Sequence, residues 1–234
     1  MTNIKYLASF GCSWTYGNSC ADIEVGSFRS LLAKKYNLDQ ISLGMPSSSL
    51  QSMQWQLVWW LKNTDLSIIK QTFVLVGLTG EDRTSWFNNQ YKCDVSLPPW
   101  DKSIHNTMIN PKEYNNIDFD AWGNIKKFHY VYSHCEELTQ LNLDSASILF
   151  DSVGAKYNIP VLQFNTVATK KPTNIDTFYD IEMNDILLHE HFPPNDNHPN
   201  ELGHAVIAEK LTEIIEANKL ITYNSNSKYI ILSC

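Results

Sequence analysis

The sequence lacks a hydrophobic run long enough to cross a membrane, and its basic residues are scattered. No stretch approaches the roughly 18 consecutive apolar residues that predict a membrane-spanning helix. Lysine and arginine number 18 against 25 aspartates and glutamates, which gives a formal net charge of -7. A chain with this balance does not offer the basic face that nucleic-acid binding needs. We therefore expect neither a membrane nor a nucleic acid among its partners.

Cysteine is sparse and irregularly spaced, which argues against a disulfide framework or a zinc site. The five cysteines include no CxxC pair, and an odd number cannot all pair with one another. Free thiols are typical of a reducing compartment. The N-terminal apolar run is short and no basic region precedes it, so no signal peptide is expected. These absences predict a cytoplasmic protein.

What the sequence does contain is an alternation of apolar strands and amphipathic helices. Hydrophobic residues make up 43% of the 234 residues, enough for a substantial core. Strands are predicted at residues 4–10, 40–44, 71–79 and 160–166, and helices at 26–38, 47–63, 126–159 and 200–218. Within the second helix, the spacing of Trp55, Trp59 and Trp60 predicts that all three are core residues. The alternation predicts one α/β domain over residues 1–234, a three-layer α/β/α sandwich with a central parallel sheet.

Residues 86–125 interrupt this alternation. The segment is rich in asparagine, proline, aspartate and aromatic residues and shows no clean period. A stretch of this length without a regular pattern is unusual as a plain connection and is typical of a functional loop. We predict an insertion or lid here.

The ends of three predicted strands carry polar and glycine-rich sequences. In parallel sheets, ligands bind beyond the carboxyl ends of the strands. The first strand is followed by GCSWTYG (residues 11–17), the second by GMPSSS (44–49) and the third by GLTGEDR (77–83). The glycines around Ser13 allow a sharp turn that presents its hydroxyl beyond the strand. The plainer alternative is that Ser13 caps a helix.

A second polar motif lies near the C-terminus, in PPNDNHPNELGH (193–204). A serine hydroxyl is a poor nucleophile until a base takes its proton, and that base is usually oriented by a carboxylate. The motif offers His198 as a base, with Asp196 two residues before it. The alternatives are a helix-capping histidine and an exposed turn aspartate.

Two rival chemistries depend on other residues. Cys12 could supply a thiolate nucleophile, but it is adjacent to Ser13 on an extended segment, so its side chain should point the other way. His189 and His191 are spaced as a metal pair on a strand would be, yet no third ligand lies at a telling distance. We predict no metal site and no cofactor.

The two motifs together resemble those of the SGNH, or GDSL-type, hydrolases. The family's first block, G-D-S-x-T-x-G, and its last block, an acid and a histidine followed by Pro-Asn and Gly-His, both have counterparts here. The matching residues are Gly11, Ser13, Thr15, Gly17, Asp196, His198, Pro199, Asn200, Gly203 and His204. The resemblance covers nearly the whole chain. It implies a flavodoxin-like fold and hydrolysis of esters, thioesters or related acyl bonds, with acyl transfer in some members.

The resemblance implies a role for each residue of the predicted triad. Ser13 would be the nucleophile, His198 the general base and acid, and Asp196 the group that orients the imidazole. The chain departs from the family in two places. Cys12 stands where the family has the aspartate of its first block, and Asp196 precedes His198 by two residues where many members have three. Asn195 occupies the three-back position.

The resemblance also implies an oxyanion hole. The backbone N–H of Ser13 would donate, together with an N–H from the second block, where Ser47 and Gly44 are the candidates. The family's third block supplies an asparagine side chain. This chain has Thr79 there, and its hydroxyl can also donate.

The remaining predictions concern the substrate. Trp14, Arg83 and Trp86 are candidate substrate-binding residues, with a surface ion pair as the alternative for Arg83. The polar, aromatic-rich insertion favours a small-molecule or glycan ester, such as an O-acetyl group, over long lipid chains. We therefore predict an esterase that works through a seryl acyl-enzyme. An acyltransferase using the same site, or a weakly catalytic binding protein, are the alternatives, and the oligomeric state stays open.

Overall fold

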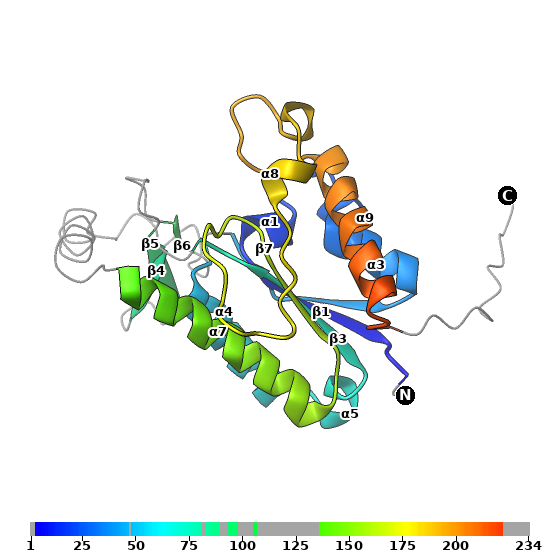
Figure 1. The fold of residues 1–234 in the computed structure, drawn as a ribbon, viewed down its shortest axis with the longest axis vertical. Helices are drawn as coiled ribbons and strands as arrows, with labels where there is room; N and C mark the ends of the chain where they lie inside the picture. The colour runs from blue at the N-terminus through cyan, green and yellow to red at the C-terminus, as the bar shows by residue number, and fades with distance from the viewer. Residues whose placement is uncertain are drawn as a thin grey trace, which may run out of the picture.

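The computed structural model describes residues 3–46, 48–80, 83–88, 93–97, 105–106 and 136–221; between residues 84 and 106 the description is of the backbone. A parallel sheet of four strands forms its centre (Figure 1). The strands are β1 (Tyr6–Gly11), β2 (Asp39–Ser42), β3 (Thr72–Leu78) and β7 (Val161–Asn165), in the order β2-β1-β3-β7. In this flavodoxin-like order, the strand sequence reverses between β1 and β3, and ligands bind at that point of doubly wound sheets.

Helices cover both faces of the sheet, as Figure 1 shows. On one face α3 (Phe28–Tyr36) packs against α9 (Glu201–Ala217), and on the other α4 (Leu50–Asn63) packs against α7 (Glu136–Tyr157). The predicted three-layer α/β/α sandwich with a central parallel sheet is confirmed. The predicted strands and helices agree with the observed elements to within a few residues wherever the structure describes the chain.

The two faces of the sheet each carry a core of buried side chains. Along β3, Phe73 and Leu75 join the core under α3 and α9, whereas Val74 and Val76 join the core under α4 and α7. A parallel strand that is buried on both faces has a continuous apolar sequence. This double burial fixes the position of the strand ends, and the candidate site lies beyond those ends.

The helix termini follow capping rules that can be seen in the sequence. The Ser49 side chain accepts a hydrogen bond from the Ser52 N–H at the start of α4. The Asn200 side chain does the same for the Gly203 N–H at the start of α9. Such caps stabilise a helix by about 1 kcal/mol. The Asn200 cap fixes the point at which the loop that carries His198 enters the helix.

Shorter elements connect these layers. They are α1 (Ser13–Tyr16), α2 (Ile23–Gly26), α5 (Leu66–Ile69), α8 (Met183–Ile186) and the 3₁₀ helix η3 (His189–His191). Within the region predicted as an insertion or lid, β4 (Thr84–Asn88), β5 (Cys93–Leu97) and β6 (His105–Asn106) form an antiparallel sheet. These strands were not predicted. The role of this region stays a prediction, and the rest of it lies outside the described residues.

The expectation that three tryptophans of α4 are core residues is wrong for two of them. Trp60 is buried and packs edge-on against Phe10. Trp55 and Trp59 are 42% and 60% exposed. The two exposed residues lie four apart on one stripe of the helix, while Trp60 follows the stripe of Met53 that faces the sheet.

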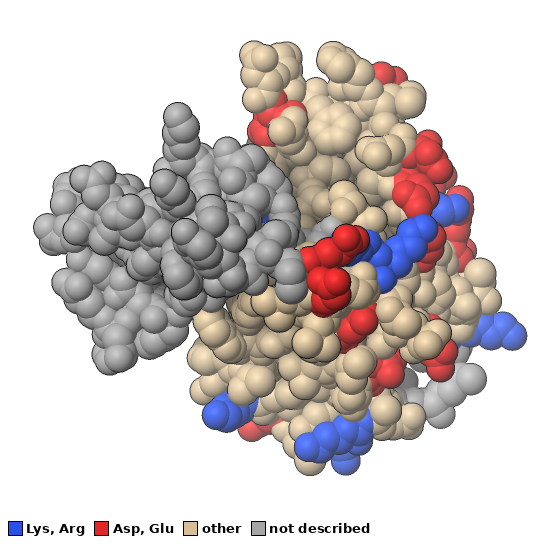
Figure 2. All heavy atoms as spheres, turned by 60° about the vertical axis from the view of Figure 1, so that its left-hand side comes forward, with Lys and Arg blue, Asp and Glu red and all other residues tan. Residues whose placement is uncertain are grey.

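The charged side chains do not form a patch of one sign on the face shown in Figure 2, where acids and bases are interspersed. Several surface charges are joined in ion pairs. Lys171 contacts Asp180 at 2.5 Å and Glu182 at 2.8 Å, and Lys170 contacts Glu136 at 3.1 Å. In addition, no helix within the described ranges has the length and hydrophobicity to cross a membrane.

Candidate active site

Ser13 lies at the turn that leads from β1 into α1. Tyr16 donates its N–H to the Cys12 carbonyl at 2.9 Å, so Ser13 is the first residue of a helical turn. A backbone N–H at that position has no acceptor within its helix and is free to meet a negative charge. At Gly11, a Cβ atom would lie 2.1 Å from the Thr15 Oγ1, so only glycine fits under this turn.

A chain of hydrogen bonds joins Ser13 to the C-terminal motif. Ser13 Oγ lies 2.8 Å from His198 Nε2, and His198 Nδ1 lies 2.5 Å from Asp196 Oδ1. An ionised carboxylate can only accept, so Nδ1 carries the hydrogen. In the neutral imidazole Nε2 then accepts from the Ser13 hydroxyl. The structure thus brings together the three residues predicted as a triad, across 185 positions of sequence between serine and histidine.

The short spacing between Asp196 and His198 is accommodated by a local turn. Asp196 Oδ1 accepts the backbone N–H of His198 at 3.0 Å as well as its ring Nδ1–H. An aspartate side chain that bonds to the backbone two residues on is a common turn. The preceding residue, Asn195, has a φ of 63°, in the left-handed region that asparagine tolerates well. Two-residue spacing therefore suffices to place the carboxylate on the imidazole.

Ser19 is a site residue that the sequence did not indicate. Its hydroxyl donates a hydrogen bond to Asp196 Oδ2, the carboxylate oxygen that does not face His198. Partial burial acts to raise the pKa of Asp196, but the hydrogen bonds from Ser19 and His198 outweigh it and hold that pKa below its ordinary value. Asp196 is therefore ionised at neutral pH, as an acceptor of Nδ1–H must be. No spacing rule links Ser19 to a residue 177 positions away.

The second-block candidates lie beside the nucleophile turn as far as they are described. The N–H groups of Leu43 and Met45 donate to the Ser9 and Gly11 carbonyls of β1 at 2.9 and 3.0 Å. A Cβ atom at Gly44 would lie 3.3 Å from the Tyr16 backbone nitrogen. The other candidate, Ser47, lies outside the described residues.

Thr79 lies at the end of the neighbouring strand. Gly11 of β1 is paired with Gly77 of β3, so Ser13 and Thr79 each follow a paired glycine by two residues. Thr79 is fully buried, and its Oγ1 accepts a hydrogen bond of 3.0 Å from Arg83 Nη1. The same Nη1 lies 3.4 Å from the Ser48 carbonyl, next to the second block. These two contacts hold Arg83 against the strand end.

The other predicted site residues have different surroundings. Trp14 is 9% exposed and packs against the ring of Phe192, so most of its surface contacts the core. Trp86 belongs to β4, and its backbone alone is described. Cys12 is buried, with its Sγ 3.7 Å from Thr166 Oγ1. The thiol therefore packs in the core, as the extended geometry predicts.

Two of the described histidines outside the triad, His191 and His204, have structural surroundings. His191 Nδ1 accepts the Leu188 N–H at 2.8 Å, within the short helix η3. The described residues contain no group of three or more histidine, cysteine, aspartate or glutamate side chains arranged to hold a metal. His204 is fully buried, and burial is the main reason that its pKa is lowered to about 4. Its Nδ1 accepts the Phe28 N–H at 3.3 Å.

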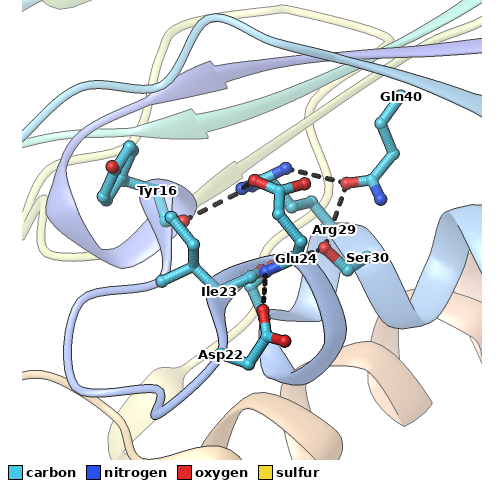
Figure 3. A network of polar contacts seen from close by, with 8 residues as sticks. Tyr16, Asp22, Ile23, Glu24, Arg29, Ser30 and Gln40 are labelled. Carbon is cyan, nitrogen blue, oxygen red and sulfur yellow. Dashed lines mark hydrogen bonds and ion pairs between the residues drawn. The ribbon is translucent and has the colours of Figure 1, made fainter.

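A buried arginine is hydrogen-bonded to the end of the nucleophile turn (Figure 3). Arg29 is 1% exposed, and its Nε donates to the Tyr16 carbonyl, at the end of α1, at 3.4 Å. Its Nη1 donates to Gln40 at 2.7 Å and its Nη2 pairs with Glu24 at 2.8 Å. A buried cation is stable only when its donors are satisfied. Arg29 therefore ties the nucleophile turn to β2 and to α2, which follows the loop that carries Ser19.

No protein-family model and no curated protein sequence matches the chain, but solved structures do. A member of the lipolytic protein G-D-S-L family from Veillonella parvula DSM 2008 is 12% identical, with a TM-score of 0.49 over 91% of this chain and 98% of that one. A protein assigned to the same family from Desulfitobacterium hafniense DCB-2 is 10% identical, with a TM-score of 0.47 over 90% and 99%. A carbohydrate esterase is 11% identical, with a TM-score of 0.47 over 93% and 66%. Because a fold does not determine a reaction, the function follows from the side chains of the site.

Proposed function

We propose that this protein is a serine hydrolase that cleaves an ester through a seryl acyl-enzyme. The observation that carries the proposal is the hydrogen-bonded chain from Ser13 through His198 to Asp196, with distances of 2.8 and 2.5 Å. A nucleophile within hydrogen-bond reach of a base that is oriented by a third group is the arrangement that acyl transfer needs.

In the acylation step, Ser13 Oγ attacks the carbonyl carbon of the ester, and its proton passes to His198 Nε2. Asp196 stabilises the imidazolium that forms. When the tetrahedral intermediate collapses, the bond between the acyl carbon and the ester oxygen breaks. His198 gives its proton to the leaving alkoxide, which departs as an alcohol.

Deacylation repeats these steps with water. A water molecule attacks the acyl carbon while His198 Nε2 takes one of its protons. The bond to Ser13 Oγ then breaks, and His198 returns the proton to the serine. The products are one carboxylic acid and one alcohol for each ester and water consumed, and the enzyme is regenerated.

The oxyanion of the tetrahedral intermediates needs donors at the same strand ends. The Ser13 N–H is one, because it begins a helical turn. Thr79 is a second: Arg83 donates to its oxygen, which leaves the hydroxyl hydrogen to donate to the oxyanion. Gly44 or Ser47 would add a backbone N–H. Preorganised donors of this kind are usually the largest single contribution to catalysis.

The proposed substrate is a short acyl ester on a carbohydrate or another polar molecule, without a cofactor. Ser13 is only 5% exposed, which favours a small acyl group over a bulky one. Arg83, Trp14 and Trp86 are the proposed substrate-binding residues, Trp14 through the small part of its surface that stays exposed. The cytoplasmic location stays a prediction.

The test compares hydrolysis of p-nitrophenyl acetate and butyrate by the wild type, Ser13→Ala and His198→Ala, with phosphonate labelling mapped by mass spectrometry. Exposed residues of the same types provide matched controls, Ser152→Ala and His189→Ala. We expect activity to disappear in Ser13→Ala and His198→Ala but not in the two controls. In the wild type, the phosphonate adduct should lie on Ser13. Wild-type turnover no faster than that of Ser13→Ala, with Ser13 unlabelled, would favour a binding protein of this fold.

A second candidate function, acyl transfer to an alcohol, uses the same residues up to the acyl-enzyme. It differs only in the group that His198 deprotonates for the second step. Product analysis with and without added sugar or alcohol acceptors separates the two. Ester products formed from the acceptor, at the expense of free acid, would favour the transferase.

A further inference from the structure

We infer that Ser19 is a positioning residue of the active site, which fixes the Asp196 carboxylate so that it holds His198 in the productive orientation. The inference rests on the proposed function, because it assigns Ser19 a part in activating Ser13. It adds a fourth residue to the hydrogen-bonded chain, on a loop that belongs to neither of the two sequence motifs.

The carboxylate of Asp196 is bound on both of its oxygens. Oδ1 accepts from the ring Nδ1 and from the backbone N–H of His198, at 2.5 and 3.0 Å. Oδ2 accepts from the Ser19 hydroxyl. Without this last bond, both remaining contacts are made by Oδ1 and nothing holds Oδ2. The orientation of the carboxylate group is then less constrained. Since the Asp196 side chain is 37% exposed, water would then compete for it.

The backbone at Ser19 is held in a conformation that serine seldom adopts. Its φ is 69°, in the left-handed region, where a residue other than glycine costs of order 1 kcal/mol. Conformations of this kind persist only where surrounding contacts impose them, and they concentrate at functional sites. Here the left-handed turn aims the hydroxyl at the carboxylate.

The contacts that impose this conformation lie on both sides of Ser19. On the N-terminal side, the Asn18 N–H donates to the Ser13 carbonyl at 3.0 Å, which ties the loop to the nucleophile turn itself. On the C-terminal side, the Ala21 N–H donates to Glu201 Oε1 at 2.5 Å, in the first turn of α9. The ion pair between Glu24 and Arg29 secures the loop further along (Figure 3).

These anchors connect the nucleophile, the acid and the base through one short segment. The loop leaves the turn that carries Ser13, and α9 follows directly after the loop that carries His198. The hydrogen bond from Ser19 to Asp196 links the loop after the Ser13 turn to the loop that carries His198. Its hydroxyl is therefore expected to affect the chemical step and to leave substrate binding nearly unchanged.

The test separates the hydroxyl from the backbone with three substitutions. Ser19→Gly removes the hydroxyl and favours the left-handed conformation, whereas Ser19→Ala removes the hydroxyl and disfavours it. Ser19→Asn keeps a donor on a residue that tolerates this conformation. We expect kcat to fall about tenfold in both Ser19→Gly and Ser19→Ala with KM unchanged, since a hydrogen bond to a charged group is of that order. Ser19→Asn should recover most of the loss.

A double-mutant cycle tests whether Ser19 acts through Asp196. In an Asp196→Ala background, adding Ser19→Gly should change the rate of phosphonate labelling of Ser13 less than twofold, because the partner of the hydroxyl is gone. The low-field proton resonance of the His198 Nδ1–H, measured on the resting protein, gives a readout without turnover. It should broaden or shift in Ser19→Gly and stay unchanged in the control Ser152→Ala.

The outcomes separate this inference from the proposed function. If the wild type does not label at Ser13, the proposed function fails and the role of Ser19 fails with it. If the wild type labels and Ser19→Gly retains its full kcat, the hydrolase stands and the inference about Ser19 is overturned. An additive loss in the Asp196→Ala background would overturn it too, since it would place the effect of Ser19 elsewhere.

Discussion

The two sides of the candidate site differ in how their groups are assembled. On the triad side, α1, the loop with Ser19 and the loop before α9 converge on one carboxylate and one imidazole, and hydrogen bonds join their side chains in one chain. On the proposed oxyanion side, Thr79 follows β3 and its hydroxyl oxygen accepts a hydrogen bond from Arg83. The residues proposed for proton transfer are thus joined to one another by hydrogen bonds, whereas Thr79, proposed for the oxyanion, is held by Arg83.

The difference has a physical basis. Proton transfer needs a nucleophile, a base and an orienting acid at fixed distances, and few side chains can replace them. An oxyanion needs only hydrogen-bond donors aimed at the right point, and backbone amides, hydroxyls or amide side chains can all supply them. A threonine at position 79, where the hydrolases that the sequence resembles have an asparagine, is therefore compatible with the proposed catalysis, provided that the hydroxyl points at the oxyanion. The predictions below test each side in turn.

The largest effect is expected on the triad side. Asp196→Asn should lower kcat by about 10⁴-fold, because the asparagine can present its NH2 to Nδ1, which favours the wrong tautomer of His198, and because it carries no charge to stabilise the imidazolium. Steady-state kinetics on p-nitrophenyl acetate measure it. Asp185→Asn, an exposed aspartate in α8, is the matched control and should be silent. A loss below tenfold at Asp196 would mean that another group orients the imidazole.

The next effect belongs to the oxyanion side. Thr79→Val keeps the shape of the side chain and removes the hydroxyl, so kcat should fall about 10²–10³-fold, the typical cost of one oxyanion donor. Thr79→Ser keeps a hydroxyl and should lose far less. Urea unfolding of each variant separates this effect from a general loss of stability at a buried position. If Thr79→Val kept wild-type kcat, backbone donors alone would stabilise the oxyanion.

The contrast between the two sides also shows what sequence can and cannot predict. The apolar run of β3, the Ser49 cap and the glycines around Ser13 are local patterns, and each has one structural solution. The contact of Ser19 with Asp196 spans 177 positions and depends on a left-handed backbone conformation at Ser19. The presence of a serine does not predict that conformation. The exposure of Trp59 was mispredicted because helical spacing alone does not say which stripe of a helix faces the sheet.

Acid should lower the free energy of unfolding, because the buried His204 must take up a proton. Its pKa is lowered from 6.5 to about 4, chiefly by burial, so the unfolded chain takes up a proton first as the pH falls. The stability tied to neutral His204 is therefore complete above pH 6.5 and is lost as the pH falls toward about 4. The total loss is of order 3 kcal/mol in the free energy of unfolding.

Urea unfolding at several pH values between 7.5 and 4.5 measures this loss, with His204→Asn as the comparison. An asparagine places its Oδ1 near the position of Nδ1 and can accept the Phe28 N–H without titrating in this range. The variant should be less stable at pH 7.5 and show a flatter pH dependence than the wild type. Parallel pH dependences would mean that groups other than His204 determine acid sensitivity.

The smallest effect is expected at Arg83, which distinguishes two roles on the oxyanion side. If its guanidinium aims and polarises the Thr79 hydroxyl, Arg83→Gln should lower kcat about tenfold on neutral esters, since charge-assisted hydrogen bonds are the stronger ones. The same change in a Thr79→Val background should then add little. If Arg83 instead binds an anionic part of the substrate, KM should rise for esters that carry a carboxylate or phosphate and stay constant for p-nitrophenyl acetate. An unchanged kcat together with that rise in KM would assign Arg83 to substrate recognition, and Thr79 would then aim its hydroxyl without the arginine.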